Sequence, residues 1–81
     1  MFFVYALKSV NRKYTYVGLT ENFNRRFAEH QSGRNKTTKP YKPFKPILVE
    51  KFPTRELARA REKYLKSGIG KEYLKRKLNE L

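Results

Sequence analysis

The stretch that decides the fold is Tyr14–Gly18 (YTYVG), together with Val4–Ala6 (VYA) ahead of it. Both lie in runs rich in aromatic and β-branched residues, which are typical of strands. A mostly polar segment separates the two runs, and its asparagine suits a turn. The runs Phe2–Leu7 and Tyr14–Gly18 therefore predict a β-hairpin.

The register of this hairpin decides whether its tyrosines meet. If Lys8 pairs with Lys13, Tyr5 lies directly opposite Tyr16. Directly opposed residues share a face of the sheet, with Cβ atoms about 5 Å apart. A slip of one residue would put the two phenols on opposite faces. We expect the register that places them side by side.

A helix is expected after the second strand. Thr20 suits its N-cap, and Gly33 supplies a C-terminal stop after Ser32. Residues three or four apart lie on one side of a helix. One face of this helix therefore carries Phe23, Arg26, Phe27 and His30. We expect the arginine and the histidine to border the apolar stripe and to point at the sheet.

Three further elements complete the expected fold. Ile47–Phe52 is a third strand, and Lys71–Leu78 is a last helix. Between them, a helix capped by Thr54 ends at Gly68. The apolar face of this helix consists of Leu57, Ala58, Tyr64 and Leu65. The order β-β-α-β-α-α predicts a single α/β domain over residues 1–81, with a three-stranded antiparallel sheet flanked by helices.

The charge balance points to a polyanionic partner. Twenty lysines and arginines oppose seven glutamates, which gives a net charge of +13 at pH 7. Such a field attracts nucleic acid. A membrane surface is less favoured, because the sequence lacks a basic helix with a wide apolar face. We expect a nucleic-acid partner and no membrane contact.

The residue types that are missing exclude several chemistries. The chain has no cysteine, no aspartate and a single histidine. Disulfides, cysteine nucleophiles and zinc sites made of protein ligands alone are therefore not expected. The apolar run Met1–Leu7 is too short to span a bilayer and lacks the charges of a signal peptide. We expect a cytoplasmic protein whose metal, if any, is a hard cation held by few carboxylates.

A basic segment, Arg34–Pro46, interleaves lysines with prolines and aromatic residues. The Lys-Pro dipeptides favour extended backbone that does not join a sheet. The alternatives are a solvated loop and a loop that tracks phosphates, in which Tyr41 or Phe44 stacks on an unpaired base. The candidate nucleic-acid contacts are Arg25, Arg34, Lys36, Lys39, Tyr41, Lys42 and Lys45.

These residues, taken in order, resemble the GIY-YIG nuclease domain family. Val4–Ala6 stands where that family has its first triplet, and Tyr16–Gly18 where it has its second. Arg26 follows Tyr16 by ten residues, as the family's helix arginine does, and His30 comes one turn later. A further match is Ala60-Arg61-Glu62, which looks like the family's glutamate helix.

The resemblance covers nearly the whole chain. Within the family, the chain resembles the N-terminal nuclease domain of the bacterial excision-repair endonuclease. Two positions depart from the pattern. The first triplet keeps its tyrosine but lacks its glycine and isoleucine, and Leu19 stands where the excision-repair branch has a lysine.

The resemblance implies a metal-dependent DNA endonuclease that acts in repair or on structured DNA. Glu62 would be the sole protein ligand of Mg²⁺ or Mn²⁺. Tyr16 would activate water with help from Tyr5 or His30, and Arg26 would steady the charge on the phosphate. A guanidinium can grip a phosphate with two hydrogen bonds, which a lysine cannot do. Well-studied members borrow targeting from elsewhere, so a targeting protein partner is expected.

Simpler explanations exist for each of these residues. Strands are rich in tyrosine, so Tyr5 and Tyr16 could be ordinary strand aromatics. His30 could be a structural histidine. Glu62 could merely pair with Lys66 one turn later, which is worth about 0.3–0.5 kcal/mol. The chain would then be a non-catalytic nucleic-acid-binding module on the same fold, with the tyrosines and the glutamate apart.

Overall fold

The structure is a computed structural model that describes residues 1–80, so Leu81 of the predicted domain lies outside the described residues. One antiparallel sheet has the strand order β2-β1-β3. Its strands are β1 (Phe2–Ser9), β2 (Thr15–Thr20) and β3 (Phe44–Phe52). The helices are α1 (Phe23–Ser32), the 3₁₀ helix η1 (Lys39–Tyr41), α2 (Arg55–Lys66) and α3 (Gly68–Asn79). The predicted α/β class and element order are confirmed.

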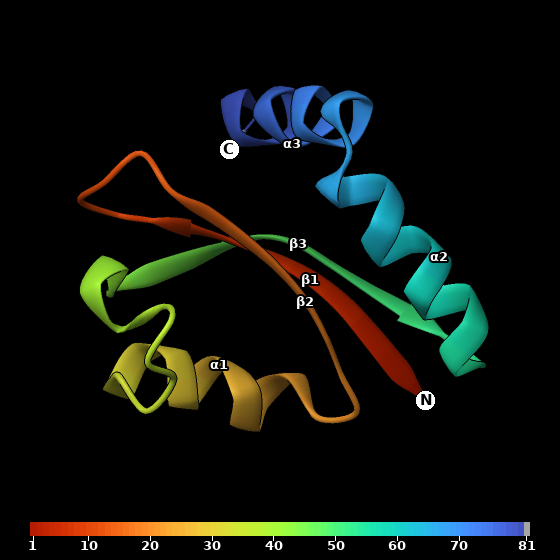
Figure 1. Cartoon of the computed structure of the whole chain (residues 1–81), viewed down its shortest axis with the longest axis horizontal. Coiled ribbons are helices and arrows are strands. Elements are labelled where there is room, and N and C mark those ends of the chain that lie inside the picture. Colours follow the sequence, from red (N-terminus) through yellow and green to blue (C-terminus); the bar gives the residue numbers. More distant parts are fainter. Residues whose placement is uncertain (81) are drawn as a thin grey trace.

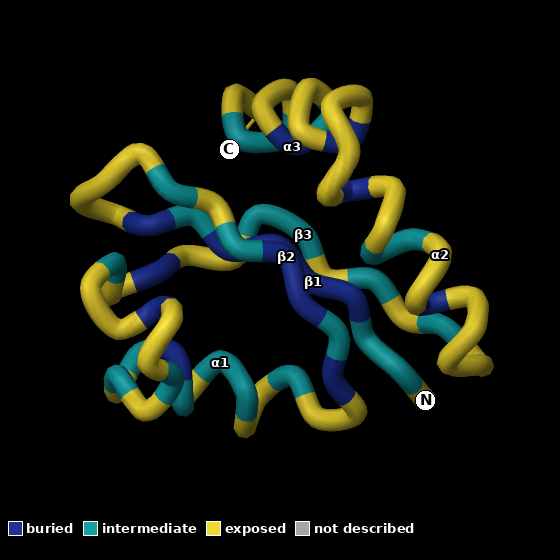
Figure 2. Tube along the Cα trace, in the orientation of Figure 1, coloured by how far each residue is buried: buried dark blue, intermediate teal, exposed yellow. Residues whose placement is uncertain are grey.

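The sheet lies between two helical layers, with α1 on one side and α2 and α3 on the other (Figure 1). Because alternate residues of a strand face opposite sides, β1 contributes to both layers. Val4 and Ala6 pack in the cluster that contains Leu65 of α2 and Leu74 of α3. Tyr5 and Leu7 belong to the second cluster, which includes the rings of α1. β1 is therefore buried in the centre of the molecule (Figure 2).

The hairpin register differs from the predicted one by two residues. Lys8 pairs with Thr15, and Tyr5 lies opposite Gly18. The predicted direct opposition of Tyr5 and Tyr16 is therefore wrong. Since side chains alternate with a period of two, a shift of two residues keeps both phenols on one face. Their ring centroids are 6.1 Å apart, as diagonal neighbours.

A buried serine explains why the first strand runs past its predicted end. Ser9 is fully buried, and its backbone N–H donates to the carbonyl of Tyr14 at 2.9 Å. Its hydroxyl donates to the carbonyl of Tyr41 at 2.6 Å and accepts from the N–H of Arg12 at 3.2 Å. These contacts extend the hairpin ladder beyond the residues that the apolar pattern marks.

The first helix begins later than predicted. Asn22, not Thr20, is its N-cap, and the Asn22 side chain accepts from the N–H of Arg25 at 3.1 Å. Thr20 stays in β2, where its buried hydroxyl accepts from the N–H of Asn22 at 3.2 Å. The predicted stop at Gly33 is confirmed, because this residue adopts φ 82° and caps the helix.

The third strand begins three residues before its predicted start and includes Pro46. Phe44 pairs with Ser9 and Pro46 with Leu7, and the register shifts by one residue between Ala6 and Leu7. The prediction that the Lys-Pro segment stays out of the sheet is therefore wrong for its last part. β3 is an edge strand, where a proline without an N–H is tolerated.

The second helix is capped by Thr54, as predicted, through a hydrogen bond from the N–H of Leu57 at 3.3 Å. It ends at Lys66, however, because Ser67 caps the next helix by accepting from the N–H of Gly70 at 3.2 Å. Gly68 therefore starts α3 and does not end α2, and α3 begins three residues before its predicted start. None of the described helices is both long and apolar enough to cross a membrane.

The predicted apolar face of α2 is half correct. Ala58 and Leu65 are fully buried, whereas Leu57 and Tyr64 are exposed. Between these positions Arg61 turns toward the sheet and binds Glu50 of β3 through two hydrogen bonds of 2.7 and 3.1 Å. The helix is thus attached to β3 by a charged pair as well as by apolar contacts.

Candidate active site

A chain of buried polar groups lies between the sheet and α1. The Tyr5 hydroxyl is 3.0 Å from Nε2 of His30, and Nδ1 of His30 is 2.8 Å from the hydroxyl of Thr38. Tyr5 is 1% exposed, and His30 and Thr38 are fully buried. The prediction that His30 points at the sheet, which rested on helical spacing, is therefore confirmed.

The direction of these hydrogen bonds follows from the one that the Thr38 hydroxyl donates. The Thr38 hydroxyl donates to the carbonyl of Asn35 at 3.4 Å, so it is free to accept from Nδ1–H of His30. A neutral imidazole protonated at Nδ1 has a lone pair on Nε2. The Tyr5 hydroxyl then donates to that lone pair. This series of hydrogen bonds places the His30 proton on Nδ1 and directs the Tyr5 O–H inward, toward Nε2 of His30.

The pKa values of both groups are shifted in the direction that keeps them neutral. Burial, and next the Arg26 guanidinium, lowers the pKa of His30, while Glu29 opposes this change. Burial first and the neighbouring Tyr16 phenol second raise the pKa of Tyr5, against the effect of Arg26. At neutral pH the Tyr5 hydroxyl therefore keeps its proton and can donate it to Nε2 of a neutral His30, whose Nδ1–H donates to Thr38.

Tyr16 is the more accessible of the two phenols. Its side chain is half-buried, and its ring centroid lies 5.0 Å from that of His30 and 6.1 Å from that of Tyr5. Phe23 covers the Tyr5 ring edge-on, with centroids 5.5 Å apart. Tyr16 thus borders the buried chain while remaining open to water.

Arg26 lies beside this cluster on α1. Its guanidinium pairs with Glu29 at 3.3 Å, and 39% of its side chain is exposed. Its positive charge acts on the pKa of both Tyr5 and His30. A guanidinium that is both near the phenols and open to solvent can approach a phosphate bound there.

Glu62 approaches from the opposite layer, because α2 packs on the other side of the sheet. Burial is the largest cause of the raised pKa of Tyr5, and the negative charge of Glu62 is the smallest of the contributions to it. The Glu62 side chain is only 13% exposed, and its oxygens face Lys66 at 3.1 Å and Arg59 at 3.9 Å. The Glu62 carboxylate is therefore already paired with cations of its own helix.

The donor set suits a hard cation with few protein ligands. Among residues 1–80, no three His, Cys, Asp or Glu side chains gather in a way that could hold a metal ion. Mg²⁺ keeps several waters and is often bound by one or two carboxylates together with substrate phosphate. A single carboxylate such as Glu62 fits that mode, whereas it does not fit a zinc site.

The predicted nucleic-acid contacts are mostly solvent-exposed. Arg25 on α1 and the basic residues of the loop point into solvent: Arg34, Lys36, Lys39, Lys42 and Lys45. The aromatic residues of the loop behave differently. Tyr41 stacks on Tyr14, with ring centroids 3.8 Å apart and an interplanar angle of 8°, so one of its faces is covered. Phe44 is 3% exposed, so its predicted availability for a base is wrong.

Sequence reasoning missed Thr38. It lies eight residues after His30, in a loop that the composition marks only as polar and basic. No periodicity relates the two residues, because Gly33 ends the helix between them. The contact exists because the loop turns back along α1, where the N–H of Thr38 donates to the carbonyl of Asn35 at 3.2 Å.

Known proteins share sequence similarity with this chain. The family described as the GIY-YIG catalytic domain matches residues 1–79. UPF0213 protein lwe0147 of Listeria welshimeri and UPF0213 protein lin0209 of Listeria innocua are each 47% identical over 57 residues. The match covers 69% of this chain and 62% of each relative, so the chain spans about three fifths of the relatives' length. No solved structure matches the chain significantly.

Proposed function

Since the chain belongs to the GIY-YIG catalytic domain family, a family of nucleases, we propose that it is a metal-dependent DNA endonuclease. The observation that carries this proposal is the gathering of four groups around one buried phenol. Tyr5 contacts His30 and lies beside Tyr16. The charges of Arg26 and Glu62 act on its pKa, in addition to the larger effect of burial. Taken singly, each residue has a structural explanation; their convergence from β1, β2, α1 and α2 favours a site.

Tyr16 is the residue best placed to activate the attacking water. It is half-buried, whereas the hydroxyl of Tyr5 and Nε2 of His30 engage each other inside the protein. Tyr5, with its raised pKa, keeps its proton and positions the neighbouring ring. His30 holds Tyr5 in that orientation and does not itself meet water.

Arg26 would bind the scissile phosphate and stabilise the charge that develops on it, as preorganised cations do in phosphoryl transfer. Glu62 would hold the divalent ion, which when bound supplies a Lewis acid beside the phosphate. Magnesium and manganese both suit a single carboxylate with water ligands.

The substrate that fits the surface is DNA. The chain carries a net charge of +13, and the segment 34–43, whose lysines and arginine are exposed, lies next to the C-terminal end of α1 (Figure 1). Phosphate contacts of this kind fix orientation and give little sequence selectivity. We propose that the protein acts in repair or processing of structured DNA in the cytoplasm, with a protein partner that directs it to its target.

A nicking assay tests this function directly. Wild type and three variants, Tyr16→Phe, Arg26→Ala and Glu62→Gln, are incubated with branched, mismatched and single-stranded DNA in Mg²⁺ or Mn²⁺. Loss of the acid–base group Tyr16 should cost about 10²–10⁴-fold in rate. Loss of the Arg26 charge should cost about 10²–10³-fold, and loss of the Glu62 carboxylate should remove the metal and with it cleavage. Glu72→Gln, which changes an exposed glutamate of α3, is the charge-matched control and should cut normally. Cleavage that survives Glu62→Gln contradicts the site.

One observation favours a second candidate, a non-catalytic nucleic-acid-binding module. The Glu62 carboxylate is paired with Lys66 and Arg59, as expected of a purely structural glutamate. If no DNA is cut under any condition, while salt-sensitive DNA binding persists, this second candidate is the function.

A further inference from the structure

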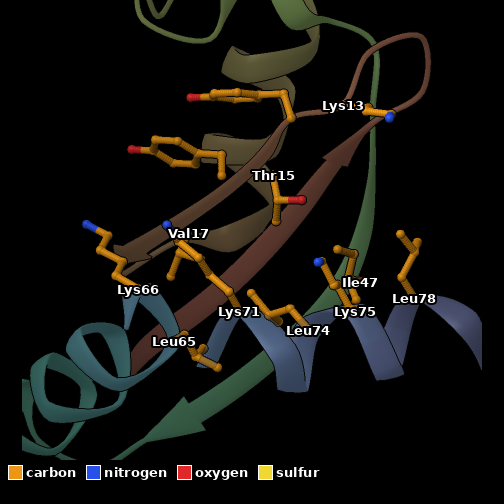
Figure 3. Close-up of a pocket in the computed structure, with 12 residues that line it drawn as sticks. Lys13, Thr15, Val17, Ile47, Leu65, Lys66, Lys71, Leu74, Lys75 and Leu78 are labelled. Carbon is orange, nitrogen blue, oxygen red and sulfur yellow. The ribbon is translucent and has the colours of Figure 1, made fainter. Parts of the chain in front are cut away.

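A hollow of ≈ 540 Å³ opens between β2 and α3 and reaches around the edge of β2 to Tyr14 and Tyr16. Thr15 and Val17 project from β2 toward α3 (Figure 3). The floor is aliphatic, formed by Val17 with Leu65 and Leu74. The volume lies within the range of about 300–1,000 Å³ that is typical of sites for small organic groups.

Lysines line this hollow together with the aliphatic floor. Lys13 comes from the hairpin loop, Lys66 from the end of α2, and Lys71 and Lys75 from successive turns of α3 (Figure 3). None of the described residues that line the hollow is acidic. An apolar floor bordered by four like charges is complementary to a ligand with a flat apolar body and more than one negative charge.

A nucleotide within a DNA strand has this chemistry. We propose that the hollow holds one unpaired nucleotide of the substrate strand, with its base on the aliphatic floor and its flanking phosphates on the lysines. Ammonium groups bind phosphates as point charges and adapt to their position. This inference rests on the proposed function and specifies its substrate, which is DNA with an unpaired nucleotide beside the cut.

The hollow and the candidate active site share two structural elements. Tyr16 itself lines the hollow, between Thr15 and Val17 in β2, and β2 is an edge strand of the sheet. Lys66 lines the hollow and also lies 3.1 Å from the Glu62 carboxylate. A DNA strand with a phosphate at Tyr16 therefore needs to cross only the open edge of β2 to enter the hollow. A base that makes this crossing must leave its pair, since it turns away from the duplex stack.

The test measures binding without cleavage, in the Glu62→Gln variant and without metal. The double variant Lys71→Gln/Lys75→Gln removes two lysines of the hollow. Its control, Lys63→Gln/Arg76→Gln, removes two exposed cations that do not line the hollow. Fluorescence anisotropy compares a labelled single strand with a duplex of equal length.

The two double variants should weaken duplex binding equally, because they lose the same charge. Single-strand binding should fall about 10-fold more in the hollow variant than in its control, since two phosphate contacts are lost there. Equal losses for the single strand overturn the inference, even if cleavage persists. If the hollow variant loses more single-strand affinity than its control but the protein never cuts DNA, the subsite is supported. Only the proposed endonuclease activity is then refuted.

A second measurement places the base. Methyl resonances of Val17, Leu65 and Leu74 should shift when the single strand is added and not when the duplex is added. Thr15→Trp, at an exposed strand position that tolerates aromatic residues, should fill the mouth of the hollow and abolish those shifts. Shifts that a short apolar peptide reproduces, and the single strand does not, would assign the hollow to a protein partner and overturn the inference.

Discussion

Tyr5 and Gly18 are directly opposed in the ladder between β1 and β2, and the Tyr5 ring occupies the space that a side chain at position 18 would fill. A Cβ at Gly18 would lie 2.5 Å from the Tyr5 hydroxyl oxygen and 2.9 Å from Cε2 of Tyr16. Both distances are shorter than real contacts allow. The glycine of the second triplet therefore makes room for the two phenols whose arrangement defines the candidate site.

Gly18→Ala should disturb both tyrosines at once. Because the phenols must move or the strands must separate, we expect a loss of about 1–3 kcal/mol in the free energy of unfolding, as for overpacked cores. DNA cleavage should fall with it. Urea denaturation and the nicking assay measure the two effects. Gly68→Ala is the control, because a Cβ there meets nothing within 4 Å; equal effects at the two positions would refute this account.

Thr38→Val should leave Nδ1–H of His30 buried without its acceptor. A buried donor that loses its partner costs about 1–3 kcal/mol, so the unfolding free energy should drop by that order. ¹⁵N NMR of the imidazole should show Nδ1–H in the wild type and a changed tautomer population in the variant. Thr38→Ser keeps the hydroxyl and should retain the wild-type tautomer; if it does not, the proposed direction of the hydrogen bonds is wrong.

His30 predicts a pH dependence of stability. Its pKa is lowered in the folded protein, chiefly by burial and then by Arg26, from an ordinary value of 6.5. The unfolded chain therefore binds a proton at higher pH than the folded one, and the stability gained from neutral His30 is lost as the pH falls below about 6.5. The thermal midpoint should be lower at pH 5.5 than at pH 7.5.

The pH dependence can be assigned to His30, because the chain contains a single histidine and no aspartate. His30→Gln should remove most of the difference between the two midpoints. A variant that keeps the full pH dependence would show that another group causes it.

Lys66→Met should strengthen metal binding at Glu62. The lysine holds one oxygen of the carboxylate at 3.1 Å, and 56% of its side chain is exposed. Exposed pairs are worth about 0.2–1 kcal/mol, so freeing the carboxylate should raise Mn²⁺ affinity about 2–5-fold in calorimetry. Lys63→Met, on the same helix, removes an equal charge and sets the baseline. The same gain in both variants would mean that the ion pair does not compete with the metal.

Local patterns predicted the parts of the site that lie within one element. The helical spacing of Arg26 and His30 placed both on the face that meets the sheet, because α-helical geometry repeats regardless of context. The predicted hairpin register was wrong by an even number of residues, so Tyr5 and Tyr16 still share a face. The exact register was missed, because it depends on Ser9, whose hydroxyl binds the distant carbonyl of Tyr41.

The sequence by itself determined the element order and the basic character of the surface, since these follow from periodicity and charge. Only the tertiary structure decided that Tyr5 faces Gly18, that Thr38 holds His30, and that Glu62 pairs with Lys66 and Arg59. The first two of these relations join residues of different elements. They depend on how the sheet twists, how a loop folds back and how helices pack, which no local pattern specifies.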